Sequence, residues 1–343
     1  MKTFVTFGEV MLRLKSPGHE RLLQSPMLEA SFGGGEANVA VSLANYGLPS
    51  AFVSILPDNS LADRCIAELR GLGVDTCHIQ RAGERMGIYF LETGSNQRPS
   101  KVIYDRAHSA LAASGPDAIP WEQVFEQAGW LHVTGITPAL SDSAAALTLS
   151  ALQAAKAHGL LVSCDLNHRK NLWKYGKSAP QVMGELVSYV DTLIANEEDC
   201  QNSLGIKIGT HDVEEGQIDL KAYEAIAREV KARYPRLQRV AITLRRSLSA
   251  DRNTWQACLL EGSSFLVSRA YDVSDIVDRV GAGDSFCGGL IYGLNRYDSS
   301  QTALEFAVAA SCLKHTIPGD YNRVSAREVE ALMQGSGSGR VQR

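Results

Sequence analysis

The sequence predicts an α/β fold built on a mostly parallel, doubly wound sheet. From Trp130 onward, short apolar segments alternate with longer segments of helical periodicity, as in strands joined by crossover helices. Polar residues follow several of these strands, and ligands of such sheets bind beyond the carboxyl ends of the strands. In addition, glycine-rich segments at 33–35 and 281–283 each open a predicted helix. We therefore expect one ligand-binding crevice at the carboxyl edge of the sheet.

Size and charge favour an enzyme or binding protein for a small molecule. The chain has 343 residues, long enough for one large or two smaller domains, and a formal net charge of −4. Its 34 basic and 38 acidic residues are spread along the chain, so neither nucleic acid nor membrane is an expected partner. No apolar run reaches the ~18 residues of a membrane span, no signal peptide precedes the first strand, and the seven cysteines form no CxxC pair. We expect a cytoplasmic protein with reduced thiols.

The first part of the chain predicts strands both inside and outside the main core. Residues 4–8 and 52–56 are typical of buried strands, and 60–70 of a helix with one apolar face. Residues 11–14 and 28–32 alternate more weakly around a turn-rich stretch, so we expect short strands outside the core.

The segment 32–38 starts a helix that is predicted to end near Gly47. Three consecutive glycines let the backbone approach a polar ligand closely, and Asn38 offers donors and an acceptor to hydroxyl groups. A dinucleotide-binding fingerprint fits poorly, because its third glycine is missing. The alternative is a flexible turn in which Asn38 only caps neighbouring backbone.

Residues 86–93 and 101–106 form a second pair of alternating segments, joined by the hairpin-like stretch 94–99. On a solvated sheet face their polar side chains would be ordinary surface residues. These side chains include Tyr89, Tyr104 and Arg106.

The remaining chain alternates between predicted strands and helices. Several polar residues directly follow strands or begin helices, namely Asn167, Arg169, Asn196, Arg245 and Asp284. The expected strands are 130–135, 160–165, 192–195 and 239–243, and the expected helices are 143–158, 220–234, 286–294, 300–313 and 325–333.

The segment 278–286 places a carboxylate behind two glycines at the start of a helix. Phe286, Leu290 and Leu294 recur at four-residue spacing, which predicts a helix buried on one face. Backbone N–H groups and the helix dipole at such an N-terminus favour a phosphate. Asp284, in the first turn, could then accept the proton of a hydroxyl that attacks the phosphorus. The alternative is a carboxylate that only stabilises the helix start.

Two motifs resemble those of the ribokinase-like (PfkB) sugar kinases. Residues 33–38 resemble the family's N-terminal sugar-binding motif, and residues 278–290 resemble its C-terminal signature around the catalytic aspartate. The motifs stand in the expected order, and the similarity covers nearly the whole chain. Shorter segments are similar to the 2-keto-3-deoxygluconate kinases of this family, namely Leu56–Asn59, Tyr104–Ala107, Asp165–Arg169, Thr243–Arg245 and Ile317–Asp320.

The resemblance implies a ribokinase-like three-layer α/β/α domain over residues 1–334. A small β-sheet lid would come from about 10–32 and 86–107, with a homo-oligomer formed through it, and 335–343 would be a flexible tail.

The resemblance also implies the roles of individual residues. Asp284 would be the catalytic base, and the loop formed by Gly281, Ala282 and Gly283 would stabilise the transferred phosphoryl group. The sugar-acid site would comprise Gly34, Gly35, Asn38, Tyr89, Tyr104, Arg106, Arg169 and Asp320. The nucleotide would lie against Asn167, Asn196, Thr243, Arg245, Ser247, Gly281 and Gly283.

The activity so implied is transfer of the γ-phosphoryl group of ATP, with Mg²⁺, to the terminal hydroxyl of 2-keto-3-deoxygluconate. A buried substrate carboxylate needs a cation, which Arg106 or Arg169 can supply. No protein ligands of a metal are identified. Alternatives are kinases of 2-keto-3-deoxygalactonate, fructose or ribose, and a sugar-binding sensor that has lost catalysis.

Three positions depart from the pattern of the family. Pro57 stands where many members have glycine, which argues against the ribokinase and fructokinase branches. Asp199 ends an Asn-x-x-Glu motif with a shorter carboxylate. Residues 245–248 replace the glycine-rich nucleotide loop of most relatives, so the purine contacts are not specified.

Overall fold

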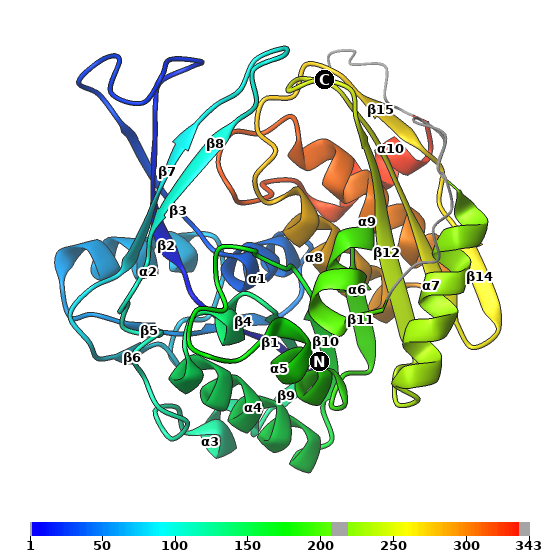
Figure 1. The fold of residues 1–343 in the computed structure, drawn as a ribbon, viewed down its shortest axis with the longest axis horizontal. Helices are drawn as coiled ribbons and strands as arrows, with labels where there is room; N and C mark the ends of the chain where they lie inside the picture. The colour runs from blue at the N-terminus through cyan, green and yellow to red at the C-terminus, as the bar shows by residue number, and fades with distance from the viewer. Residues whose placement is uncertain (1, 207–218, 336–343) are drawn as a thin grey trace.

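Within residues 2–206 and 219–335, which the computed structural model describes, nine strands form a central sheet (Figure 1). The strands from β4 to β12 in this sheet are parallel, whereas β13, β14 and β15 extend one edge in antiparallel pairing. In spatial order they are β14 (Ser264–Val267), β13 (Asn253–Glu261), β12 (Arg239–Ser247), β11 (Thr192–Ala195), β10 (Leu161–Asp165), β9 (Ala128–Thr134), β1 (Thr3–Phe7) and β4 (Ser50–Val53), and β15 (Tyr271–Val273) pairs with β13.

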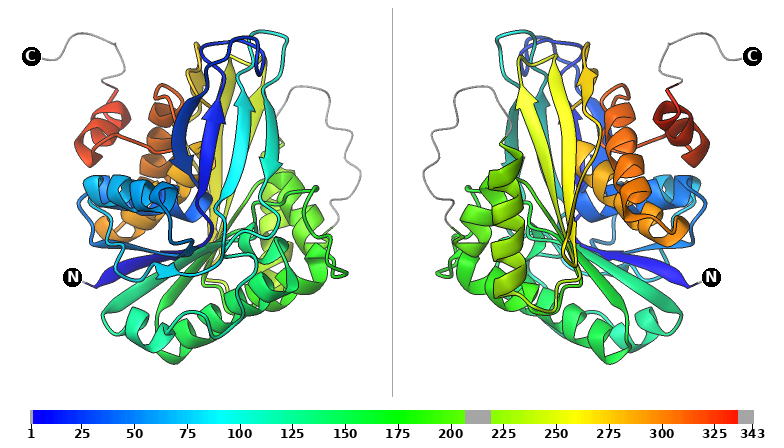
Figure 2. Two further views of the ribbon diagram at one scale, coloured as in Figure 1. Left: turned by 90° about the vertical axis from the view of Figure 1, so that its left-hand side faces the viewer. Right: turned by 90° about the vertical axis from the view of Figure 1, so that its right-hand side faces the viewer.

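Helices cover both faces of this sheet (Figure 2). Side chains of the central strands are therefore buried on both sides. In β9, Leu131 and Val133 enter one apolar cluster, while Trp130 enters the cluster on the opposite face. The first cluster is shared with α3 (Trp121–Phe125), α4 (Asp142–Ala157), α5 (Ala179–Val187), α6 (Glu197–Leu204) and α7 (Leu220–Arg233). The second is shared with α1 (Gly35–Asn45), α8 (Ala282–Arg296), α9 (Ser300–Lys314) and α10 (Ala326–Met333).

A separate four-stranded sheet projects from the main domain and is called the lid sheet here. β2 pairs with β3 and β7 with β8 in antiparallel fashion, and the two hairpins join through parallel β2 and β7. Its base packs with α2 (Ser60–Gly71) and α1 in a third apolar cluster. Its strands, in order, are β3 (Glu29–Gly33), β2 (Met11–Lys15), β7 (Gly87–Glu92) and β8 (Lys101–Asp105).

The remaining elements are short. β5 (Ile55–Leu56) pairs with β6 (Gln80–Arg81), and a 3₁₀ helix spans Thr137–Ala139. Of the expected tail 335–343, residues 336–343 lie outside the described residues. No helix in the described ranges has the length and apolarity needed to cross a membrane.

The strand expected at 239–243 is longer than predicted. β12 continues to Ser247 because it pairs with β13 along its whole length, from Arg239 opposite Glu261 to Ser247 opposite Asn253. The prediction also omitted β6, β13, β14, β15, α3, α5 and α6. Of these, β13, β14 and β15 complete one sheet edge, and α3, α5 and α6 belong to one helical layer.

Candidate active site

A cavity of about 530 Å³ lies between the lid sheet and the carboxyl ends of the parallel strands. Both glycine segments line it, as do side chains that follow β10, β11 and β12. The structure therefore brings together every site residue that the sequence predicted except Ser247. The residues of that prediction that line the cavity are Gly34, Gly35, Asn38, Tyr89, Tyr104, Arg106, Asn167, Arg169, Asn196, Thr243, Arg245, Gly281, Ala282, Gly283, Asp284 and Asp320.

Ser247 does not line the cavity, because β12 carries it onward into the antiparallel ladder opposite Asn253. Thr243 and Arg245 lie closer to the carboxyl edge and do line it. Trp255, on the neighbouring β13, also contributes to the wall. Trp255 was missed because no strand was predicted at residues 253–261.

Asp284 lies in the first turn of α8, at the cavity wall. Gly281, at the N-cap, has a φ of +84°, and the chain turns there so that the first N–H groups of the helix face outward. The Nδ2 of Asn38 donates a hydrogen bond to Asp284 Oδ2 over 2.6 Å. The two glycine-rich motifs are thus in direct contact through one carboxylate–amide pair.

Burial raises the pKa of Asp284 to about 6. The hydrogen bond from Asn38 opposes this shift, because it stabilises the ionised carboxylate. A carboxylate with such a pKa is ionised at neutral pH and is a stronger base than an exposed aspartate.

Glu36 is a buried carboxylate that sequence reasoning passed over. Its Oε1 accepts hydrogen bonds from the N–H of Thr134 at 3.1 Å and from the hydroxyls of Thr134 at 2.8 Å and Thr137 at 3.1 Å. Burial raises its pKa to about 7. These bonds join the first turn of α1 to the end of β9 and so fix the first glycine segment beside Asp284. A glutamate in a polar motif carries no sign of such burial.

Two further carboxylates lie on the wall near Asp284. Burial and the neighbouring charges of Asp199 and Asp284 raise the pKa of Asp165 well above its usual range. Asp199 accepts hydrogen bonds from the N–H groups of His168 at 2.9 Å and Asn196 at 3.1 Å. Its short side chain therefore caps α6. Asn196, predicted to contact the nucleotide, completes this capping box through its side-chain oxygen.

The two arginines that could bind a substrate carboxylate have different surroundings. Arg106 is buried, and its Nε donates to Glu9 Oε2 over 2.7 Å within an ion pair. Arg169 is exposed, and its hydrogen bond is to the carbonyl of His168 at 3.2 Å. The charge of Arg169 partly opposes the rise in the pKa of Asp165 and Asp284 that burial causes, so it acts on the cavity. Arg169 is therefore the better placed of the two to bind an anionic ligand.

Tyr89 and Asp320 contact each other on the lid side of the cavity. The hydroxyl of Tyr89 lies 2.6 and 2.7 Å from the two carboxylate oxygens of Asp320. Arg13, from the adjacent strand β2, donates to Asp320 Oδ1 at 2.5 Å. The sequence did not single out Arg13, because its partners lie far along the chain.

Comparison with known proteins places this architecture in a family. A family model described as "pfkB family carbohydrate kinase" matches residues 1–327. The chain is 33% identical over 335 residues to a 2-dehydro-3-deoxygalactonokinase of Haloferax volcanii, covering 98% of each protein. It is 28% identical to a 2-dehydro-3-deoxygluconokinase of Thermoproteus tenax, over 97% of this chain and 95% of that protein.

The fold agrees with a solved structure as well. The crystal structure of a 2-dehydro-3-deoxygluconokinase from Thermotoga maritima matches with a TM-score of 0.91 and 46% identity, over 97% of this chain and 98% of that one. The predicted ribokinase-like α/β fold and its small separate sheet are confirmed by this match. Both glycine motifs lie inside the residues that the family model matches, and the hydrogen bond from Asn38 to Asp284 joins them. The chain therefore belongs to the pfkB family of carbohydrate kinases.

Proposed function

We propose that the chain transfers the γ-phosphoryl group of ATP to the terminal hydroxyl of 2-keto-3-deoxygluconate, the 2-dehydro-3-deoxygluconate of the relatives' names. The product is the 6-phosphate. One observation carries this proposal: Asp284 lies at the amide end of α8 in the same cavity as the exposed cation Arg169. A base, an anion-binding helix end and a cation for a carboxylate are the parts that such a reaction requires.

In this mechanism Asp284 accepts the proton of the sugar hydroxyl as the oxygen attacks the γ-phosphorus. The bond from that phosphorus to the bridging oxygen breaks, and ADP leaves with the electron pair. The N–H groups at residues 281–283 stabilise the charge on the transferred group, each donor contributing about 3 kcal/mol. Asn38 orients the carboxylate of Asp284 through its 2.6 Å hydrogen bond.

When Mg²⁺ is bound, it would neutralise part of the charge on the phosphates of the nucleotide. The described residues contain no group of three or more potential metal ligands from His, Cys, Asp and Glu. This fits Mg²⁺, which keeps several water ligands and needs only one or two carboxylates besides the phosphates. Asp165 and Asp199 line the cavity, and the raised pKa of both carboxyls is what a nearby divalent cation would relieve. They are the proposed residues for this role.

The carboxylate of the substrate is assigned to Arg169. Arg106 is bound to Glu9, which keeps only 4% of its surface exposed, so Arg106 has a structural partner already. Arg106 packs over the ring of Tyr104, 5.6 Å from its centre, and so positions a tyrosine on the cavity wall.

The galactonate epimer is the second candidate substrate. The relative with 33% identity over 98% of the chain is a 2-dehydro-3-deoxygalactonokinase, whereas the structure with 46% identity is a 2-dehydro-3-deoxygluconokinase. Both substrates carry the same carboxylate and the same terminal hydroxyl. The mechanism is therefore the same for either epimer.

A panel assay of ADP release tests the proposal, with both keto acids, fructose and ribose as acceptors. Arg169→Met should raise KM for the keto acid about tenfold to a hundredfold, the loss expected for a charged hydrogen-bonded contact, and leave KM for ATP unchanged. The comparison variant Arg106→Met should chiefly destabilise the fold, by about 3 to 5 kcal/mol, because Glu9 would be left buried without its partner. A preference for fructose or ribose would refute the assignment of a sugar acid.

A further inference from the structure

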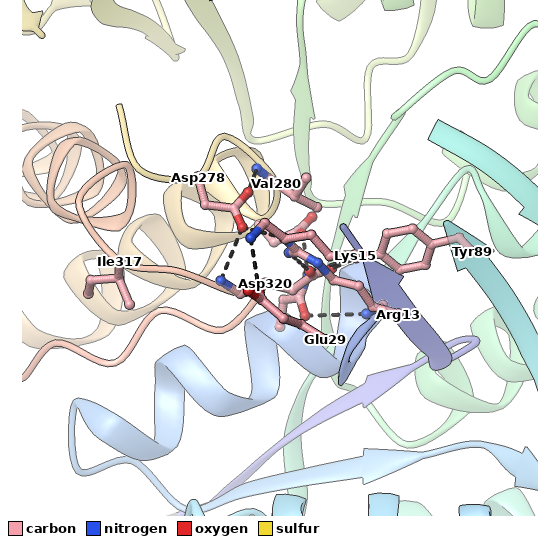
Figure 3. Close-up of polar contacts among 12 residues, drawn as sticks. Arg13, Lys15, Glu29, Tyr89, Asp278, Val280, Ile317 and Asp320 are labelled. Atoms are coloured by element: carbon pink, nitrogen blue, oxygen red, sulfur yellow. Dashed lines mark hydrogen bonds and ion pairs between the residues drawn. The ribbon is translucent and has the colours of Figure 1, made fainter. Parts of the chain in front are cut away.

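Arg13 is a charged residue of the lid sheet that lies inside the protein. Its side chain is only 1% exposed, and its guanidinium contacts two carboxylates at once. Nη1 donates to Asp320 Oδ1 at 2.5 Å, and Nη2 forms an ion pair with Asp278 Oδ2 (Figure 3). A guanidinium can serve two acceptors in this way because its donors form a rigid planar fork.

Asp278 accepts hydrogen bonds from two backbone segments, one with each carboxylate oxygen. Its Oδ1 accepts from the N–H of Val280 at 3.0 Å, at the start of the second glycine segment. Its Oδ2 accepts from the N–H of Gly319 at 3.1 Å. The segments containing Val280 and Gly319 are also packed together, since a Cβ added to Gly281 would lie 2.1 Å from the carbonyl oxygen of Asp320.

A second buried cation supports the same two segments. Lys314, at the end of α9, is fully buried, and its Nζ donates to the carbonyl of Ile317 at 3.1 Å and to that of Asp278 at 3.5 Å. With Arg13 and the two aspartates it forms a set of formal charge zero. The charge of Asp320, which lines the cavity, is therefore balanced by buried cations behind it.

We infer that Arg13 is a positioning residue for phosphoryl transfer, a role that rests on the proposed kinase function. Of the two acidic residues it contacts, Asp320 lines the cavity and accepts a hydrogen bond from the Tyr89 hydroxyl. Asp278 accepts one from the N–H of Val280, directly before the 281–283 segment. Arg13 thus joins the lid sheet, the substrate side and the phosphate-binding loop in one network. Its own side chain does not line the cavity, so it acts through these neighbours.

The test compares two substitutions on the same strand. Arg13→Lys keeps the charge but loses the fork that reaches both carboxylates. Lys15→Met, two residues along β2, removes a cation whose partner is the exposed Glu29, 2.9 Å away (Figure 3). Misplacement of a reacting group by about 1 Å can cost a hundredfold in rate. We expect kcat to fall about a hundredfold in Arg13→Lys, with KM for ATP near wild type. Thermal stability should fall as well, because one buried carboxylate loses its partner, and neither kcat nor stability should change in Lys15→Met.

Asp278→Asn provides a second variant that keeps the side-chain shape. If Arg13 acts through Asp278, a variant that combines Arg13→Lys with Asp278→Asn should lose little more activity than either single variant. The reason is that the effects of substitutions within one network do not add. Losses that multiply in the double variant would contradict the inference.

Hydrogen exchange of the segment 278–286 gives a readout that needs no substrate. Exchange should be faster in Arg13→Lys than in wild type and unchanged in Lys15→Met. Unchanged exchange, or wild-type turnover by Arg13→Lys, would overturn the role. If the wild-type enzyme phosphorylates no sugar acid, the proposed substrate fails, while the exchange experiment still decides the role of Arg13.

Discussion

Burial controls the ionisation of the carboxylates in the cavity. Asp284 and Glu36 have pKa values raised to about 6 and about 7, because the surrounding protein disfavours their charged forms. The two differ in their contacts. Asp284 faces the cavity and receives one amide donor, whereas Glu36 is enclosed by backbone and threonine donors. Both residues line the cavity, but Glu36 Oε1 already accepts three hydrogen bonds, so Asp284 remains the proposed base.

The pKa of Asp284 predicts how activity depends on pH. A general base works in its deprotonated form, so kcat/KM should fall as pH decreases through about 6 and should level off above it. Asn38→Leu removes the hydrogen bond that stabilises the ionised carboxylate, and should move the midpoint to higher pH. Asp298→Asn, an exposed aspartate past the end of α8, is the control. A profile that stays flat between pH 7 and pH 5 would argue against Asp284 as the base.

For single residues, the sequence predicted which side chains lie at the site, but not which side chains they contact. Asp284 and Asn38 could be predicted to share a site, because each follows glycines at the start of a helix. Their direct hydrogen bond could not, since 246 positions separate them. The same applies to Arg106, expected to face the substrate but paired with Glu9 across 97 positions. Which polar side chains pair inside a protein depends on packing that a single sequence does not display.

The glycine segment at the start of α8 contains two glycines with different requirements. Gly281 has a φ of +84° and lies against the backbone of Asp320, so an added Cβ would be strained and would clash. Gly283 has open space around its Cβ position and is exposed to the cavity. Gly281 therefore serves the backbone turn, whereas Gly283 leaves room for a ligand.

Alanine substitutions should separate these two requirements. Gly281→Ala should lower the free energy of unfolding by more than the ~1 to 2 kcal/mol that left-handed backbone alone costs a non-glycine residue, and should lower kcat. Gly283→Ala should keep wild-type stability but weaken ATP turnover, because its methyl group enters the space proposed for the phosphates. Thermal unfolding and steady-state kinetics measure both effects. Gly71→Ala, also with open space around it, is the control, and equal stability losses in both loop variants would contradict this assignment.

Helices and strands with a strong periodicity of apolar residues were predicted well. Segments whose strand conformation depends on pairing with another strand were not. Helix α4 was expected at 143–158 and spans Asp142–Ala157. By contrast, β12 was expected to end at Thr243, before the arginines at 245 and 246. Its last residues are exposed and remain in strand conformation through pairing with β13. The sequence of β12 alone does not contain that information.

On the scale of the whole molecule, the edge strand β8 of the lid sheet is exposed to solvent. All five residues of β8 are exposed, and Ile103 and Val102 keep 56% and 39% of their surface accessible. An exposed apolar edge strand is a site for pairing with another chain. We propose that two copies associate through this sheet, as the sequence resemblance implied.

This association predicts a dimer whose stability depends on Ile103. Ile103 lies outside the cavity lining, so Ile103→Glu should give a monomer without removing a residue from the site. Sedimentation at several protein concentrations measures the change. Leu161→Glu, at an exposed position at the start of β10, should leave the assembly intact. A wild-type protein that sediments as a monomer at all concentrations would rule out the lid interface.

The proposed mechanism depends on Asp284 as the base between the sugar site and the phosphate-binding loop. The most direct measurement is turnover by Asp284→Asn, with ATP affinity determined by calorimetry. The amide keeps the shape of the side chain but cannot accept the proton, so kcat should fall by about 10² to 10⁴ while the Kd for ATP stays near wild type. Asp298→Asn should be fully active. Turnover by Asp284→Asn at close to the wild-type rate would contradict the mechanism.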